Sequence, residues 1–203
     1  MTVEPLISSV NTADINTIQG TYPIKPTFTT DPETHTRCTP GSEFVGIVKE
    51  SASSQEGLQP GRLVLPRTVG LGSWCSSLPP LPAHHFIPVS AITDDPEPPI
   101  EALLAMQVNP STALVMLEKF GGAGLRRGDV VVLTAATSAV ATAASSIAAR
   151  VYGCAVVAVA RRRDRTDGEW EALCESLREE HHASMVLSEE EVSVHTLHHY
   201  ESF

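Results

Sequence analysis

The clearest hydrophobic pattern of the chain lies between residues 129 and 163, where two apolar runs flank a turn and a segment of small residues. Val130–Leu133 is a short β-branched run of the kind that is buried in a parallel sheet, and the Ala-rich segment after it is long enough for a helix. Cys154–Ala160 repeats the strand pattern, and Gly153 stands where a helix would end. The pattern predicts a βαβ unit. A run of arginines follows it, as is typical of the first part of a nucleotide-binding sheet.

The first hundred residues predict a different architecture. Glu43–Glu50 alternates like a strand, and a Gln-Pro-Gly turn leads into a second predicted strand, Arg62–Leu65. Near the start, residues 11–14 offer capping side chains for a short helix that Gly20 would end. Pro23–Pro40 shows no periodicity and is predicted to be an extended loop. Together these features indicate small, mostly antiparallel β architecture.

Three further helices and one strand are predicted downstream. Ile100–Val108 has helical periodicity, and a second helix follows Asn109-Pro110 with one apolar face made by Ala113, Leu114, Leu117 and Phe120. Glu169–Glu180 is expected to be a charged surface helix, and Ser184–Leu187 a third short strand. All fifteen prolines lie before residue 111, so we place a domain boundary near residue 105, between residues 1–105 and 106–203.

Composition narrows the classes of partner. The 203-residue chain is 42% hydrophobic and carries 24 acidic against 14 basic side chains, a formal charge of −10, so we expect no nucleic-acid partner. No apolar run approaches the ~18 residues of a membrane helix, so no membrane partner is expected. The four cysteines are widely spaced and never form a CxxC pair, which favours reduced, mostly structural thiols.

Several sequence blocks occur in the order of one known family. They are Val10-Asn11, Asp14-Ile15-Asn16, Ile18 to Tyr22, Gly41-Ser42-Glu43, Gly57 to Gly61, Pro66, Gly70 to Trp74, Val108-Asn109-Pro110, Thr112-Ala113, Gly128-Asp129 and Ser188 to Glu191. With these blocks the chain resembles the mitochondrial trans-2-enoyl-thioester reductases of the medium-chain dehydrogenase/reductase superfamily. The resemblance implies an α/β fold, with a partial GroES-like β domain followed by a partial Rossmann (βαβαβ) domain.

The same resemblance implies a chemistry. NADPH would lie in the cleft between the two domains, and its hydride would reach the β-carbon of an enoyl thioester of CoA or acyl carrier protein. A tyrosine at the position of Tyr22 is the family's proposed proton donor to the α-carbon. A phenol suits this role because it keeps its proton at neutral pH and can donate it when an enolate develops. The alternative is a purely structural role, in which Tyr22 lies in a loop and packs its ring on the edge of the domain.

Three other residues of the family blocks have two interpretations each. Trp74 is either the wall of a substrate pocket or a hydrophobic filler of a Gly-rich loop. Asn11 and Asn109 fit the family as groups that fix loops, and each is equally compatible with an ordinary cap or turn residue.

The expected cofactor turn lacks glycine altogether. Against the fingerprint G-x-G-x-x-G, the turn offers Ala136, Ser138, Ala139, Val140 and Ala141. Ala141 is a mild departure, whereas a methyl group at Ala139 would occupy space near the pyrophosphate and would disfavour a positive φ. The helix N-terminus still attracts an anion, so we expect weakened NADPH binding at this turn.

Arginines after the second strand of the unit bear on cofactor choice. Arg161 and Arg163 match arginines of the family motif, at the position where the superfamily selects the 2′-phosphate of NADPH. A solvated basic run is the equally weighted alternative. No metal is expected: Gly41-Ser42-Glu43 lacks the histidine of the zinc-dependent relatives, and the histidines at 181, 182, 195, 198 and 199 are more typical of an exposed tail.

Relative to the family, the chain is expected to start inside the catalytic domain and to stop after the third strand of the nucleotide sheet. A three-stranded remnant leaves one sheet face poorly covered, so we expect a longer gene product, a homodimer or another protein partner. Two alternatives to an active reductase follow, an inactive relative serving as an interaction subunit and a quinone reductase. The resemblance suggests mitochondria, although no targeting segment is visible.

Overall fold

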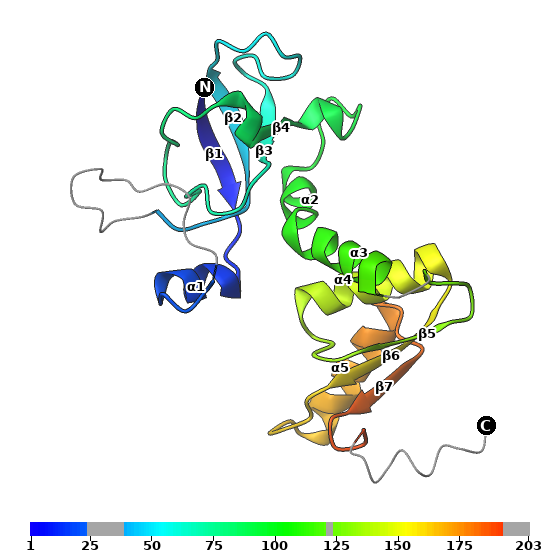
Figure 1. Ribbon diagram of the computed structural model, residues 1–203. Coiled ribbons are helices and arrows are strands. Elements are labelled where there is room, and N and C mark those ends of the chain that lie inside the picture. The colour runs from blue at the N-terminus through cyan, green and yellow to red at the C-terminus, as the bar shows by residue number, and fades with distance from the viewer. Residues whose placement is uncertain (24–38, 121–123, 193–203) are drawn as a thin grey trace. The chain divides into compact units, whose positions relative to one another are not determined.

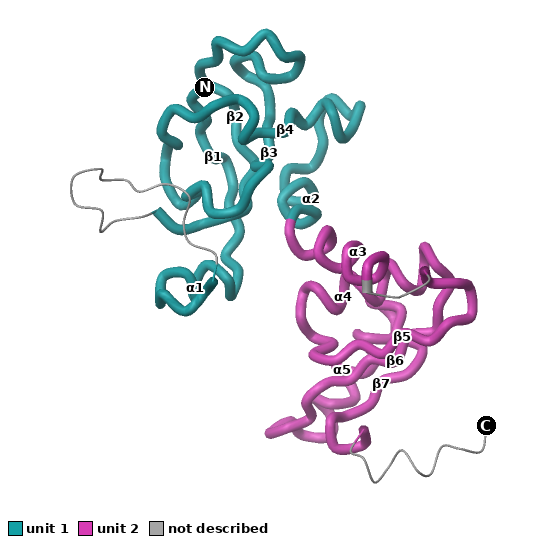
Figure 2. Tube along the Cα trace, in the orientation of Figure 1, with its two compact units in different colours: residues 1–107 teal, residues 108–203 magenta. Residues whose placement is uncertain are grey.

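The structure is a computed structural model that describes residues 1–23, 39–120 and 124–192. The chain forms two compact units, Met1–Gln107 and Val108–Phe203 (Figure 2). Each unit has its own sheet. The assignment of two incomplete domains at 1–105 and 106–203 stays a prediction. The loop predicted at Pro23–Pro40 lies almost entirely outside the described residues.

The first unit is built on a four-stranded sheet. Its order is β1-β2-β3-β4 and every neighbouring pair is antiparallel (Figure 1). The strands are β1 (Thr2–Ser8), β2 (Phe44–Glu50), β3 (Leu63–Pro66) and β4 (Phe86–Pro88). The antiparallel β architecture expected from the sequence is therefore confirmed, and β2 and β3 lie where strands were predicted.

The strands β1 and β4 were not predicted. β1 carries Glu4 and Pro5, and a proline inside a run argues against a central strand. The proline is tolerated because β1 lies at the edge of the sheet. Its outer side is partly covered, since the N–H groups of Leu78 and Leu81 donate to the carbonyls of Val3 and Met1 at 2.9 and 3.0 Å. β4 has only three residues, too few for a periodic signal.

Apolar side chains cover both faces of this sheet. One cluster gathers Val3, Phe44, Val48, Leu58, Val64, Leu71, Leu78, Leu81 and Phe86. The other gathers Val45, Leu65, Val89 and Leu103, the last from the helix α2 (Ile100–Ala105). Because β2 contributes to both clusters, its residues 44–46 are all buried and do not alternate. Two 3₁₀ turns, η1 (Ala83–His85) and η2 (Val89–Ala91), flank β4.

The second unit confirms the predicted βαβαβ order. β5 (Val130–Leu133) is followed by α4 (Ala139–Ile147) with a final π turn, η3 (Ala148–Tyr152), then β6 (Ala155–Ala160), α5 (Asp167–Glu179) and β7 (Met185–Ser188). The strands pair in parallel in the order β5-β6-β7 (Figure 1). Gly153 ends the π turn with φ of +68°, a left-handed conformation in which glycine carries no steric penalty, as predicted.

Small residues bring the helices of this unit close together. α3 (Val108–Phe120) packs on α4 and the start of η3 through Ala113, Ala144 and Ala148, which share a buried cluster with Leu117 and Val156. α5 packs over β6 and β7 through Cys174 and Leu177. Of the apolar face predicted for α3, Ala113 and Leu117 are buried, whereas Leu114 is 40% exposed. The prediction for Leu114 was wrong because the contact with alanines on α4 needs only a narrow stripe of α3.

One face of the parallel sheet is bare. Val130 and Val132 of β5 are 63% and 59% exposed, and Met185 of β7 is 48% exposed. The prediction that Val130–Leu133 is buried was therefore wrong for one side of the strand. Val131 and Leu133 contact the helices, whereas their neighbours project from the opposite face. This outcome agrees with the expectation that a three-stranded sheet leaves one face poorly covered.

Candidate functional site

A buried carboxylate in the first unit joins three segments of the family blocks. Glu43, just before β2, is 3% exposed. Its Oε2 accepts hydrogen bonds from Ser9 Oγ at 2.7 Å and from Asn11 Nδ2. Asn11 Nδ2 also donates to Ser9 Oγ at 2.9 Å. We call Ser9, Asn11 and Glu43 the Glu43 network; it ties the end of β1 and the start of the next helix to β2.

Asn11 stands immediately before α1 (Thr12–Ile18) and caps it. Its backbone N–H donates to Asp14 Oδ2 at 2.9 Å, and Asp14 is 2% exposed. A carboxylate near a helix N-terminus is stabilised both by this hydrogen bond and by the helix dipole. The short helix predicted from residues 11–14 is thereby confirmed, and its first turn is held on two sides.

Tyr22 is attached to the other end of α1. The carbonyl oxygen of Asn16 accepts the N–H groups of Thr21 and Tyr22 at 3.0 and 3.2 Å. Gly20, with φ of +73°, reverses the chain between the helix and these residues, as predicted for a helix stop. Tyr22 is partly exposed, so its side chain remains accessible from solvent.

The indole of Trp74 is anchored to the same region. Its Nε1–H donates to the carbonyl of Ser9 at 2.9 Å. The ring lies against Gly41, where a Cβ atom would stand 2.5 Å from Trp74 Cδ1 and closer still to Ser73 Oγ. Gly41 also has φ of +100°, and its carbonyl accepts the N–H groups of Gly72 and Ser73. The Gly-rich loop and the residues before β2 are thus built around one another.

Cys75 contributes a side-chain hydrogen bond within this loop. Its thiol donates to the carbonyl of Gly72 at 3.2 Å. Burial raises the pKa of the Cys75 thiol, and a backbone hydrogen bond at Ser77 opposes that shift. The raised pKa keeps the donor proton in place at neutral pH. Cys75, Cys154 and Cys174, the cysteines that lie in the described residues, are free.

The expected cofactor turn lies between β5 and α4 in the second unit. Ser138 is the N-cap of α4, and its Oγ accepts the N–H of Ala141 at 3.2 Å. Ala139 is the first residue of the helix and is exposed. The concern about positive φ at Ala139 was wrong: the left-handed residue of this turn is Ala135, with φ of +51°. Val140 follows in the first helical turn.

The arginines after β6 take different positions. A hollow of about 410 Å³ is lined by Arg162, Arg163, Asp164, Arg165, Ser188, Glu190 and Glu191. Arg163 therefore lines it, whereas Arg161 does not, although its carbonyl accepts a hydrogen bond from Arg165. Arg162 pairs with Asp167 at 2.5 Å and lies 5.8 Å from the centre of the Trp170 ring. Sequence reasoning missed Arg165, which a count of basic residues beyond the family motif would have found.

Asn109, also named from the sequence, lies in the first turn of α3 in the second unit. Glu43 and Ser9 were missed as members of a polar network. Glu43 was considered only as the third residue of Gly41-Ser42-Glu43 in the argument against zinc. A charged residue directly before an apolar strand is usually exposed, so only the buried position of Glu43 reveals its role.

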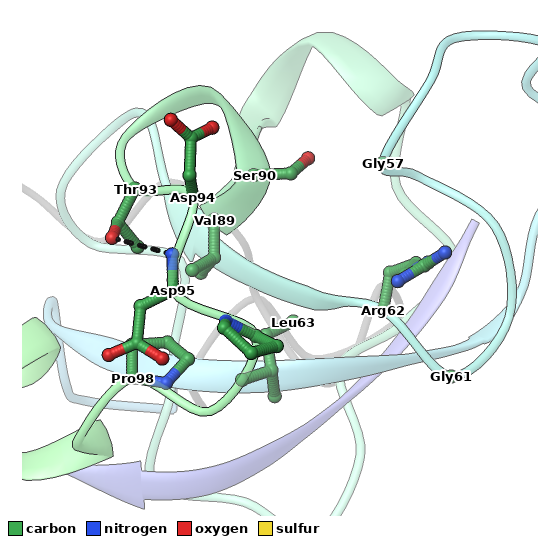
Figure 3. A pocket seen from close by; sticks show the side chains of 11 residues that line it. Gly57, Gly61, Arg62, Leu63, Val89, Ser90, Thr93, Asp94, Asp95 and Pro98 are labelled. Atoms are coloured by element: carbon green, nitrogen blue, oxygen red, sulfur yellow. Dashed lines mark hydrogen bonds between the residues drawn. The ribbon is translucent and has the colours of Figure 1, made fainter.

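A second hollow, of about 340 Å³, opens in the first unit (Figure 3). Arg62 lies on one side of it and the segment of Thr93, Asp94 and Asp95 on the other. The two carboxylates and the guanidinium are all exposed, so the hollow desolvates none of them, and we assign it no function.

Neither a metal site nor a membrane-spanning helix is found within the described part of the chain. No group of three or more histidine, cysteine, aspartate or glutamate side chains there is arranged to hold a metal ion. The histidines at 195, 198 and 199 lie outside the described residues. Among the helices the structure describes, none combines the length and apolar character that spanning a bilayer requires.

An antiparallel β unit followed by a parallel βαβαβ unit defines the class of protein. A sequence profile described as "Alcohol dehydrogenase GroES-like domain" matches residues 1–80. The first unit is therefore GroES-like and the second Rossmann-like, and in this pair of folds the chain is similar to the medium-chain dehydrogenase/reductase superfamily.

Among the members of that superfamily, mitochondrial enoyl-thioester reductases are similar to this chain. The chain is 31% identical over 162 residues to the mitochondrial enoyl-[acyl-carrier-protein] reductase of Xenopus tropicalis. This match covers 80% of the chain and 41% of the relative. A solved Etr1p/Etr2p heterodimer, the mitochondrial 2-enoyl thioester reductase of Candida tropicalis, matches with a TM-score of 0.76 at 29% identity, over 94% of this chain and 52% of that one. A complex of Etr1p with NADP and crotonyl-CoA matches with a TM-score of 0.76 at 30% identity and the same coverage. The chain thus spans about half the length of these relatives.

Proposed function

We propose that this chain belongs to an NADPH-dependent reductase of trans-2-enoyl thioesters, either as the enzyme or as one part of it. The observation that carries the proposal is the likeness over 94% of the chain to Etr1p, which was solved with NADP and crotonyl-CoA. Because relatives of this group are named as mitochondrial proteins, we propose mitochondria as the compartment. CoA or acyl carrier protein would carry the acyl group.

The second unit fits the cofactor in two respects. The first N–H groups of α4, next to the cap at Ser138, suit a pyrophosphate, because a helix N-terminus offers free donors and a positive dipole end. The chain past β6 presents Arg163 at the rim of the 410 Å³ hollow, where a guanidinium suits a 2′-phosphate. We assign Ser138, Ala139 and Val140 to the pyrophosphate, with Arg161 and Arg163 for the 2′-phosphate.

When bound, NADPH supplies the hydride. In the first unit Tyr22 would give the proton to the α-carbon of the thioester, and its backbone is fixed for this by Asn16. Trp74, whose ring is anchored by the carbonyl of Ser9, would wall the acyl pocket. Asn109, in the first turn of α3, is assigned to cofactor binding with the second unit. We assign no metal to the reaction.

The experiment is a direct assay. Purified protein is mixed with NADPH and crotonyl-CoA, and absorbance at the NADPH band is followed. We expect Tyr22→Phe to lower kcat by at least ~100-fold, the usual contribution of a positioned acid, while NADPH binding measured by fluorescence stays unchanged. If wild-type protein binds no NADPH, or if Tyr22→Phe turns over as fast as wild type, the proposal fails.

The choice of NADPH over NADH is tested separately. Arg163→Ala is expected to weaken NADPH binding ~10-fold or more and to leave NADH binding nearly unaltered, because only NADPH carries the 2′-phosphate. Arg150→Ala is the matched control, since Arg150 is an exposed arginine on the π turn, distant in sequence from the basic cluster. Equal losses for both cofactors would contradict the assignment of Arg163.

A second candidate is an interaction subunit without turnover. The bare valines of β5, Val130 and Val132, favour it, because an exposed apolar sheet face is a site for a protein partner. Stable co-purification with a stoichiometric partner, combined with no NADPH binding, would select this function. A quinone substrate added to the same assay separates a quinone reductase, a class whose likeness to this chain, at 24% identity and a TM-score of 0.60, extends to the fold alone.

A further inference from the structure

Two paths of contacts, here called branches, start at the buried carboxylate of Glu43. One ends at Tyr22 and the other at Trp74, which are both candidate site residues. Glu43 accepts from Ser9 Oγ at 2.7 Å and from Asn11 Nδ2, and both donors address the same oxygen, Oε2. The backbone carbonyl of Glu43 accepts a further hydrogen bond from Ser73 Oγ at 3.3 Å. Because two side-chain donors converge on this one oxygen, it fixes Ser9 and Asn11 together.

The first branch runs through α1. Asn11 is the residue from which the helix starts, and its own N–H is held by Asp14. α1 has seven residues, about two turns joined by backbone hydrogen bonds, so a displacement of its first turn reaches its last. At that last turn the carbonyl of Asn16 holds the N–H of Tyr22 at 3.2 Å. The place of Tyr22 therefore depends on where Asn11 is held.

The second branch runs through Ser9. Its Oγ is bound to Glu43, and its backbone N–H faces the carbonyl of Glu43 at 3.4 Å. Its own carbonyl accepts the indole N–H of Trp74 at 2.9 Å. A shift of Ser9 away from Glu43 therefore loosens the Trp74 ring, whose Nε1 edge also lies close to Gly41.

We propose that Glu43 is a positioning residue, which sets the location of Tyr22 through Asn11 and α1 and the orientation of Trp74 through Ser9. Its relevance to catalysis rests on the proposed function of Tyr22, whereas the positioning itself does not. A misplacement of about 1 Å at a reacting group can cost ~100-fold in rate, so a residue that never touches substrate can control turnover.

Two substitutions at Glu43 distinguish the loss of the hydrogen-bond acceptor from the loss of side-chain volume. Glu43→Gln places an amide oxygen where both donors point and can still accept from Ser9 and Asn11. Glu43→Ala removes the acceptor altogether. Val64→Ala is the matched control, because Val64 is fully buried in the core of the same sheet and forms no part of the Glu43 network. It should destabilise the unit without moving Tyr22.

The test reads Tyr22 directly. The protein is labelled with 3-fluorotyrosine; it has three tyrosines, and the resonance of Tyr22 is assigned with Tyr22→Phe. We expect the fluorine resonance of Tyr22 to move towards the free amino acid and to narrow in Glu43→Ala, and to stay at the wild-type position in Glu43→Gln and Val64→Ala. The fluorescence of Trp74, measured with Trp170→Phe in every variant, should shift to the red in Glu43→Ala alone.

Turnover is measured in parallel with crotonyl-CoA and NADPH. Glu43→Ala is expected to lower kcat about 10- to 100-fold with an unchanged KM for NADPH, and Glu43→Gln to restore it to within a few-fold of wild type. Should the wild-type chain itself show no turnover, the reductase assignment fails, and the fluorine spectra still decide the positioning. Should Glu43→Ala not fold, Asn11→Ala, which removes the Nδ2 hydrogen bonds to Glu43 and Ser9, is measured in its place. A wild-type Tyr22 resonance in folded Glu43→Ala, or in Asn11→Ala, overturns the proposal.

Discussion

Replacing Gly41 by alanine should destabilise the first unit far more than the same change at another left-handed glycine. Gly41 has φ of +100°, and an added Cβ would stand 2.5 Å from Trp74 Cδ1. Gly61 has φ of +84°, and its added Cβ would meet no atom within 4 Å. The two substitutions therefore share the backbone penalty, and only the first adds an overlap with the Trp74 ring.

The magnitudes follow from these two contributions. Alanine in the left-handed region costs ~1–2 kcal/mol, of which about 0.4–1 kcal/mol is offset because alanine restricts the unfolded chain. Gly61→Ala should therefore lower the free energy of unfolding by ~0–1.5 kcal/mol. The overlap at Gly41 adds the cost of an overpacked site, ~1–3 kcal/mol, and this is the expected difference between the variants. At a urea m-value of ~1–2 kcal/mol/M this difference moves the midpoint by about 0.5–3 M.

The assay uses the distribution of tryptophans. The chain has two, Trp74 in the first unit and Trp170 in the second, so Trp170→Phe leaves a fluorophore that reports on the first unit alone. Urea titrations then compare Gly41→Ala with Gly61→Ala, and the native emission of Trp74 should shift only in Gly41→Ala. Equal midpoints, or an unshifted emission in Gly41→Ala, would refute the close approach of Gly41 and Trp74.

Three further outcomes are expected in the second unit, followed by urea titration of Trp170 fluorescence with Trp74→Phe. Ala135→Gly should raise the free energy of unfolding by up to ~1 kcal/mol because it relieves a left-handed alanine with φ of +51°. Ala136→Gly, at a buried position, should instead lower the free energy of unfolding. Changes of the same sign in the two variants would contradict this account. Hydrogen bonds from Thr166 hold the pKa of Glu169 below its ordinary 4.5, so the contribution of the α5 cap to stability is complete above that pH and is lost as the pH falls through the lower folded pKa. Glu169→Gln should therefore flatten the pH dependence of the urea midpoint between about pH 5 and 3. An unaltered slope would count against the cap. Val132→Thr, on the exposed face of the sheet, should reduce binding of a hydrophobic dye and leave the free energy of unfolding within ~0.5 kcal/mol of the wild-type value. Val131→Thr, on the covered face, should destabilise the unit because it buries a hydroxyl group. Equal effects of the two substitutions would argue against a sheet that is covered on one face only.

The sequence predicted the βαβαβ order because its signals are local. Gly153 ends a helix in the left-handed region, and Cys154–Ala160 is apolar over the whole length of a strand. Which faces are covered could not be predicted in the same way. A four-residue apolar run such as Val130–Leu133 suits burial on one side or on two, and the difference depends on what packs over the sheet.

The candidate site was predicted only as separate residues. Asn11, Tyr22 and Trp74 were named one by one from family blocks, and nothing in their spacing shows that Ser9 and Glu43 connect two of them. Such contacts join residues far apart in the chain, and they depend on the pairing of β1 with β2. The roles of Tyr22, Trp74, Asn109, the α4 turn and the arginines stay predictions until the assays above are done.

The two sheets also differ in when they can form as the chain leaves the ribosome. β5, β6 and β7 are consecutive in sequence, so each pairs with the strand just before it. β1 must wait for β2, which begins only at Phe44, and the Glu43 network cannot close before then. We expect the first unit to have the slower assembly, because closing a long loop costs entropy before any contact is gained. The helix α1 is thus synthesised before β2 and is fixed in place only after β2 has formed.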